Sequence, residues 1–159
     1  MHRFVSRLSL LVLTAILASP AAALAADEWL GTWRLNLPKS RFNPPELAPK
    51  SRTLILEGTE GGLKTVIEET TAQGQSVRTE YSAKFDNKDI PWSGPIEADT
   101  VALQRIDDEY FQTMWKLKGQ PMILGGTVVS KDRKALTVTH HGKNAAGREI
   151  AQVAVYDRQ

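Results

Sequence analysis

The chain has 159 residues, with 20 Lys and Arg against 18 Asp and Glu, three His and no Cys. The lack of Cys excludes a disulfide framework, a thiolate metal site and a cysteine nucleophile. Two of the arginines lie within residues 1–26, which contain no acid, so residues 27–159 carry 18 basic and 18 acidic residues. Because a neutral chain with interspersed charges lacks a basic surface, we expect no nucleic-acid partner and no attraction to anionic membranes.

The first 26 residues have the pattern of a cleaved signal peptide. Two arginines precede an apolar run of 11 residues, Leu8–Ala18, and Ala23-Leu24-Ala25 is a small-x-small cleavage site. A membrane span needs roughly 20 apolar residues, so this run is too short for one. We expect cleavage near Ala25 or Ala26, no stable membrane insertion, and export of a soluble protein to the periplasm or the medium; an uncleaved anchor is the alternative.

Residues 27–159 alternate between runs of strand-forming residues and short turns. The runs are rich in Val, Ile, Thr, Tyr and Phe, which fit a pleated, half-buried surface, and short connections join such strands antiparallel. We expect a short strand near 88–91 and longer strands over 29–37, 51–58, 62–72, 75–85, 99–106, 109–117, 121–130, 134–142 and 148–158. Closing the sheet removes its open edges. The pattern therefore predicts one all-β domain over 27–159, an antiparallel up-and-down barrel of about 9–10 strands with few or no helices; a two-sheet sandwich is the alternative.

Two segments depart from this alternation of strands and short turns. Residues 37–50 contain four prolines, and such a segment forms neither a central strand nor a helix interior. Residues 91–99 form a second irregular loop that carries Trp92. Each segment is interpreted either as a flap over one barrel mouth or as an ordinary connection. Trp92 lines a ligand entrance, contacts a partner, or anchors its loop on the barrel.

The two ends of the barrel carry a family resemblance. GTWRL at 31–35 and VAVYDR at 153–158 resemble the first and last strands of the calycins, the lipocalins and fatty-acid-binding proteins. The resemblance implies a barrel in which Gly31, Trp33 and Arg158 are structural, with Trp33 closing one end against the last strand. The stretches GTWRLNLPKSRF, KFDNKDIPWSG, ADTVALQRID and VAVYDRQ also resemble small exported bacterial lipocalin-like proteins of unassigned function.

The chain departs from the fatty-acid-binding proteins at two places. Their cavity is covered by two helices after the first strand, where this chain has the proline-rich segment. Their last strand pairs an arginine with a tyrosine to hold the ligand carboxylate, whereas here Tyr156 is present and Ala154 occupies the arginine position. Their carboxylate site is therefore not carried over to this chain.

Several side chains are candidates for the barrel interior. Tyr81 and Tyr156 offer a hydroxyl to an apolar cavity, and Trp115 lies on a predicted strand. Arg105 shares a face with Val101 and Leu103, so it either lies inside with an anionic partner or reaches solvent at the strand end. A further interior candidate is a histidine.

His140 alternates with Leu136 and Val138 and is expected to face inward, whereas His141 faces outward, so the two cannot share a metal ion. Nitrobindin-type calycins hold haem through one histidine, and the resemblance gives His140 that role as an alternative to a hydrogen-bonded core histidine. Gly125-Gly126 is interpreted as a bulge or a bend in the barrel. No catalytic set and no metal site are expected.

The sequence thus favours an exported barrel, monomeric or weakly oligomeric, that binds a small hydrophobic molecule. The proposed ligand contacts are Tyr81, Arg105, Trp115, His140 and Tyr156. Two alternatives stay open: a haem-binding or enzymatic barrel that uses His140, and a structural or interaction protein of the cell envelope.

Overall fold

The computed structural model describes residues 27–159 as a single antiparallel sheet of eleven strands with two 3-10 turns. The strands are β1 (Gly31–Leu35), β2 (Arg41–Asn43), β3 (Ser51–Thr59), β4 (Gly62–Thr70), β5 (Ser76–Lys84), β6 (Ile90–Pro91), β7 (Thr100–Arg105), β8 (Tyr110–Leu117), β9 (Gln120–Val129), β10 (Ala135–Lys143) and β11 (Glu149–Arg158); the turns are η1 (Leu37–Lys39) and η2 (Pro45–Leu47). The all-β prediction is confirmed. The expected signal peptide lies outside the described residues. Within residues 27–159, neither turn is long enough or apolar enough to cross a membrane.

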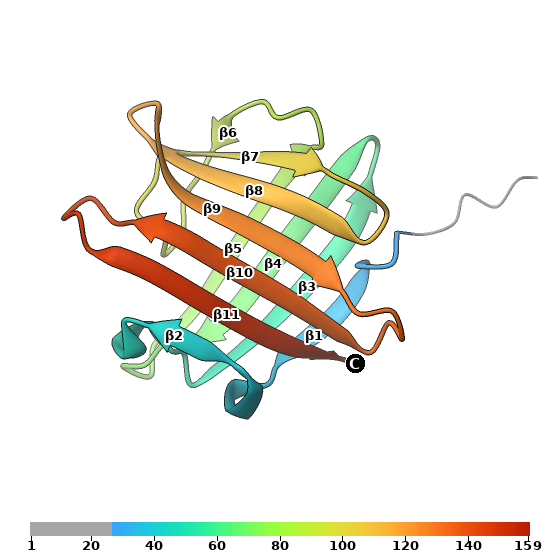
Figure 1. The fold of residues 1–159 in the computed structure, drawn as a ribbon, viewed down its shortest axis with the longest axis horizontal. Helices are drawn as coiled ribbons and strands as arrows, with labels where there is room; N and C mark the ends of the chain where they lie inside the picture. The colour runs from blue at the N-terminus through green and yellow to red at the C-terminus, as the bar shows by residue number, and fades with distance from the viewer. Residues whose placement is uncertain (1–26) are drawn as a thin grey trace, which may run out of the picture.

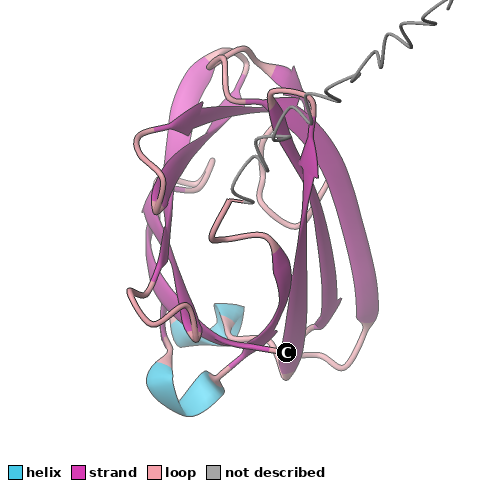
Figure 2. Cartoon of the chain, turned by 90° about the vertical axis from the view of Figure 1, so that its right-hand side faces the viewer, coloured by secondary structure: helices cyan, strands magenta, loops and turns pink. Residues whose placement is uncertain are grey.

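The sheet curls into a nearly closed barrel. Its strand order is β5-β4-β3-β1-β11-β10-β9-β8-β7-β6, so most strands pair with their neighbours in sequence. Strands β7 to β11 form one layer that crosses over β1, β3, β4 and β5 (Figure 1), and the two layers form a ring when viewed from the side (Figure 2). The antiparallel barrel was therefore predicted correctly.

The ladder is incomplete at one place, between β5 and β7, which we call the seam. Among the described residues, backbone pairing across the seam is limited to an isolated bridge between Asp86 and Gln104 and a hydrogen bond from the Asn87 amide to the Leu103 carbonyl (2.9 Å). The sheet is therefore nearly closed. After β5 the chain runs along β7, where Ile90 and Pro91 of β6 pair with Val101 and Thr100, and it then turns back over residues 91–99.

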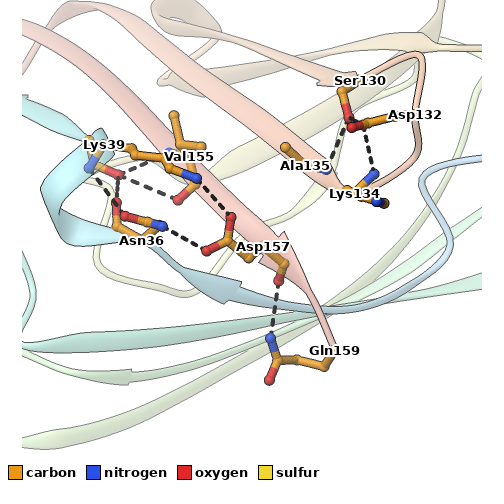
Figure 3. A network of polar contacts seen from close by, with 10 residues as sticks. Asn36, Lys39, Ser130, Asp132, Lys134, Ala135, Val155, Asp157 and Gln159 are labelled. Atoms are coloured by element: carbon orange, nitrogen blue, oxygen red, sulfur yellow. Dashed lines mark hydrogen bonds and ion pairs between the residues drawn. The ribbon is translucent and has the colours of Figure 1, made fainter.

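The first strand continues beyond its proline break. Both β1 and β2 pair with β11: β1 pairs with the last residues of β11, and β2 pairs with the first half of β11. At the break, the Ser40 hydroxyl accepts the Val155 amide (2.9 Å) and donates to the Asn36 carbonyl (2.7 Å). The Asn36 side chain also donates to Asp157 (2.7 Å; Figure 3). Residues 37–50, expected to be irregular, therefore contain a short edge strand whose pairing is bridged by a serine hydroxyl.

One end of the barrel, which we call the closed end, is filled by aromatic side chains. Trp29 and Trp33 are fully buried there, and Trp29 contacts Phe85 and Phe111 edge-on at 6.1 and 5.2 Å between ring centroids. The Trp33 indole donates to the Trp29 carbonyl (2.8 Å). Burial of aromatic side chains supplies much of the apolar stabilisation of a small domain, so the closed end is a stabilising core.

Arg158 covers this core from β11. Its guanidinium lies 4.1 Å from the centroid of the Trp33 ring, and it donates to the carbonyls of Leu30 (2.8 Å), Glu28 (2.6 Å) and Arg133 (2.7 Å). A Cβ on Gly31, whose φ is +130°, would lie 2.9 Å from the Arg158 Nη1. Glycine is needed at that position because it has a positive φ and leaves room for the guanidinium.

Candidate functional site

A cavity of about 490 Å³ occupies the interior at the other end, which we call the open end. Apolar side chains form most of its wall, among them Leu54, Leu56, Phe111, Ile123, Val138 and Ile150. These residues point inward because strand side chains alternate between the two faces of the sheet. Turn η2, the 71–73 turn, the 95–97 loop and Asn144 line the mouth. Both irregular segments therefore contribute to one mouth.

A row of aromatic rings crosses the cavity wall. Tyr81 contacts Trp92, Trp92 contacts Trp115, and Trp115 contacts His140, each edge-on, with centroids 5.4, 5.8 and 4.9 Å apart. The rings come from β5, the 91–99 loop, β8 and β10. Edge-on packing of this kind is favourable and gives the cavity one aromatic side.

Gly125 makes room for this row. A Cβ at Gly125 would lie 2.7 Å from Cζ3 of Trp115 and 3.3 Å from Cδ2 of His140. Of the two interpretations of Gly125-Gly126, a bulge or a bend, the bulge is not found: both glycines pair in regular register with β8, and the register shift of this ladder lies between Trp115 and Lys116. The inward-facing glycine serves close packing instead of a change of register.

Trp92 folds back into the barrel. Its side chain is 7% exposed, its indole donates to the Ile96 carbonyl (2.9 Å), and its amide donates to the Asp99 carbonyl (2.9 Å). The ring lies beside Tyr81 of β5 and Trp115 of β8, so it covers the seam from inside. Of the three roles considered for Trp92, an exposed partner contact is contradicted by its burial.

A polar group faces the cavity next to the mouth. Arg52 donates through Nε to Oε2 of Glu69 (2.6 Å), with Nη2 at 2.5 Å from the same oxygen, and its Nη1 lies 3.4 Å from the Tyr156 hydroxyl. Burial disfavours the charged guanidinium, but Tyr156 and Glu69 raise the pKa of Arg52, so it stays charged. The charges of Arg52 and Glu69 therefore neutralise each other within the cavity wall.

His140 lies beside this group as an uncharged imidazole. Burial, together with the nearby Arg52 charge, lowers the pKa of His140 to about 4, and a hydrogen bond with Gln152 opposes the shift. Burial also raises the pKa of Tyr81, with the Thr65 side chain opposing. At neutral pH, both side chains therefore offer the cavity hydrogen-bonding groups without charge.

The structure places four of the five expected contact residues in the cavity wall: Tyr81, Trp115, His140 and Tyr156. Arg105 is not among the residues that line the cavity. It lies at the closed end, where it pairs with Asp27 (2.7 Å) and Asp108 (2.9 Å) and its guanidinium is 5.0 Å from the Trp29 ring. Arg105 ends β7 where Trp29 fills the barrel, so its side chain passes over that ring to solvent.

The sequence reasoning missed Arg52, Glu69 and Gln152. A signal for two of them was present in the predicted hairpin, because the turn at Gly61 sets Arg52 directly opposite Glu69. Arg52 also alternates with inward-facing Leu54 and Leu56. When the two strands of this hairpin are aligned from that turn, Arg52 and Glu69 come to lie opposite each other, which identifies the ion pair. Among residues 27–159, no three His, Cys, Asp or Glu side chains are grouped so as to hold a metal ion.

Comparison with solved structures identifies the fold. The chain is similar to zebrafish ileal bile acid-binding protein in complex with cholic acid, with a TM-score of 0.52 and 9% identity, over 83% of this chain and 99% of that one. It is also similar to a protein of unknown function of the DUF3598 family from Nostoc punctiforme, with a TM-score of 0.49 and 17% identity, over 83% of this chain and 48% of that one. No family model and no curated protein matches the sequence.

The strand order, the near closure and the packing of Arg158 on Trp33 define a calycin-like barrel. The expected fold resemblance is thereby confirmed. The likeness at 9% identity concerns the fold alone, so the role of the cavity is argued from its own residues.

Proposed function

We propose that this barrel binds a small, mainly apolar molecule in its interior cavity. The supporting observation is the cavity itself: its volume of about 490 Å³ falls in the range of roughly 300–1,000 Å³ of small-molecule sites. Its wall combines an apolar majority with hydroxyl, amide and charged side chains that can orient a ligand. The aromatic row of Tyr81, Trp92 and Trp115 adds a rigid apolar surface for a ligand to pack against.

The proposal is tested by filling the cavity from one strand of its wall. Val138 lines the cavity, whereas Thr137 precedes it and faces outward. We expect Val138→Trp to weaken binding of the uncharged dye Nile red at least tenfold, measured by its fluorescence increase. Thr137→Trp, the matched control, should leave the affinity within about threefold. Equal affinity in Val138→Trp and the wild type, with both folded by circular dichroism, would contradict the proposal.

Haem binding through His140 is a second candidate function. It is favoured by one observation, the imidazole that lines the cavity and has a pKa of about 4, because a neutral imidazole is the form that ligates a metal. Hemin added to the wild-type protein should then give a Soret band that His140→Ala lacks. A band of equal strength in both proteins would remove His140 from this role.

Export is part of the proposed function. It is supported by the arginines, the apolar run of 11 residues and the Ala-Leu-Ala site in residues 1–26. Expression of the full chain in a Gram-negative host should yield a periplasmic protein whose N-terminal sequence begins at Ala26 or Asp27. Recovery of the intact chain from the cytoplasm would contradict export.

A further inference from the structure

The charges that face the cavity are unevenly distributed. Arg52 is the only Lys or Arg side chain that lines it, whereas three carboxylates, those of Glu46, Glu69 and Glu97, line it. Glu46 pairs at the mouth with Arg148 (2.5 Å). Glu97 accepts the Ala145 amide (3.3 Å) and has no basic partner among the described residues. Arg52 thus offsets Glu69 and Arg148 offsets Glu46, so that Glu97, exposed at the mouth, is the one lining carboxylate left without a basic partner among the described residues.

The single positive group is already used within the protein. Two nitrogens of Arg52 share Oε2 of Glu69, and these side chains are only 15% and 10% exposed. Such charge-assisted contacts are among the stronger hydrogen bonds in proteins. A ligand anion that drew Arg52 away would leave Glu69 as a buried, unpaired carboxylate, which is strongly unfavourable.

Uncharged ligands avoid this cost. Nη1 of Arg52 and the Tyr156 hydroxyl, 3.4 Å apart, form one polar point in a wall that also carries the hydroxyls of Thr65, Thr113 and Thr127. A hydroxyl, ester or ketone oxygen accepts a hydrogen bond there without disturbing the ion pair, whereas a carboxylate also loses its hydration. The neighbouring His140 adds no compensating positive charge at neutral pH.

We infer that the cavity selects an uncharged amphiphile, with one hydroxyl or carbonyl oxygen at the Arg52–Tyr156 point and an apolar body in the barrel, and rejects the matching carboxylate. This inference rests on the proposed function, since it concerns the same cavity. The Arg52–Glu69 pair then determines which ligand charge is accepted, because Glu69 already occupies the guanidinium that an anionic ligand would need.

The test is competition against Nile red at pH 7.5 with three compounds of equal chain length: 1-dodecanol, methyl dodecanoate and dodecanoate. We expect the alcohol and the ester to displace the dye at concentrations at least tenfold lower than the carboxylate. In Glu69→Gln, Arg52 loses its charged partner, so dodecanoate should gain at least tenfold in affinity while dodecanol changes by less than about threefold.

Glu68→Gln is the matched control, because Glu68 is the preceding residue on β4, faces outward and pairs with Arg78 (2.5 Å). It should keep the wild-type order of the three compounds. Tighter or equal binding of dodecanoate by the wild type would overturn the inference, as would an unchanged order in a folded Glu69→Gln protein. The wild-type comparison decides the matter even if Glu69→Gln does not fold. Failure of Nile red and all three compounds to bind the wild type would overturn the proposed function, and the inference with it.

Discussion

The two ends of the barrel each place an arginine beside an aromatic side chain, with different results. At the closed end, Arg158 stacks on Trp33 and gives its hydrogen bonds to three backbone carbonyls. At the open end, Arg52 lies near Tyr156 and is paired with Glu69. The first arginine joins the terminal strands to the rest of the sheet; the second sets the charge of a cavity. The same residue type therefore packs on a core at one end and, in the inference above, selects the ligand at the other.

The largest effect is expected at the closed end, from Trp33→Ala. Trp33 is fully buried and its indole donates to the Trp29 carbonyl, so truncation should lower the free energy of unfolding by about 3–5 kcal/mol. Urea denaturation measures the change. A loss below about 1 kcal/mol would show that the closed end is not the main core.

The next effect belongs to the open end and depends on pH. Because the pKa of His140 is lowered from 6.5 to about 4, the unfolded chain takes up a proton at higher pH than the folded protein does. Stability from this group is thus fully present above pH 6.5 and lost as the pH falls toward 4, by about 3 kcal/mol in total.

Urea denaturation of the wild type and of His140→Gln over pH 4–7.5 measures this loss. As the pH is lowered from 7.5 to 4, the free energy of unfolding should decrease less in His140→Gln than in the wild type. His141→Gln is the control, since His141 is adjacent on β10 and exposed on the outer face. Parallel curves for the wild type and His140→Gln would contradict burial of a neutral imidazole.

Arg158→Lys should cost about 2 kcal/mol, because an ammonium cannot reach three carbonyls and stack on Trp33 at once. Arg34→Lys, at an exposed position of β1, should change the free energy of unfolding by less than about 0.5 kcal/mol. Thermal denaturation of both variants compares the two positions. Similar melting temperatures for the two variants would show that Arg158 has no special role in closing the barrel.

The smallest effect on stability, about 1–2 kcal/mol, is expected from Gly125→Ala, whose Cβ would press on Trp115. Its effect on Nile red affinity should be larger than that of Gly126→Ala, because the Cβ at Gly126 would meet Tyr110 and Thr139 on the outer face. If both variants bind the dye as the wild type does, the Trp115–His140 packing does not shape the cavity.

Sequence patterns were sufficient where a residue's position follows from alternation along its own strand. His140 was expected inside the barrel from its alternation with Leu136 and Val138, and it lines the cavity, as do Tyr81, Trp115 and Tyr156. Arg105 has the same inward alternation, yet it reaches solvent because Trp29, from outside that strand, already fills the barrel at its level.

Other features depend on segments that no periodicity describes. Trp92 lies in the cavity because its loop folds back on itself with a close approach of Gly94 to the ring. Strand β2 exists because Phe42 pairs opposite Gln152, a contact across more than a hundred residues of sequence. The Arg52–Glu69 pair was predictable in principle, since it needs only the register of one hairpin.

The seam between β5 and β7 has a mechanical consequence. Nearly every other strand boundary is held by a ladder of backbone hydrogen bonds, but the described residues join these two strands by only one bridge and one further hydrogen bond, both near the closed end. This line is therefore where the wall has the fewest backbone hydrogen bonds to break, and Trp92 lies beside it between Tyr81 and Trp115. We expect a ligand larger than the cavity of about 490 Å³ to separate β5 from β7 before it breaks any ladder.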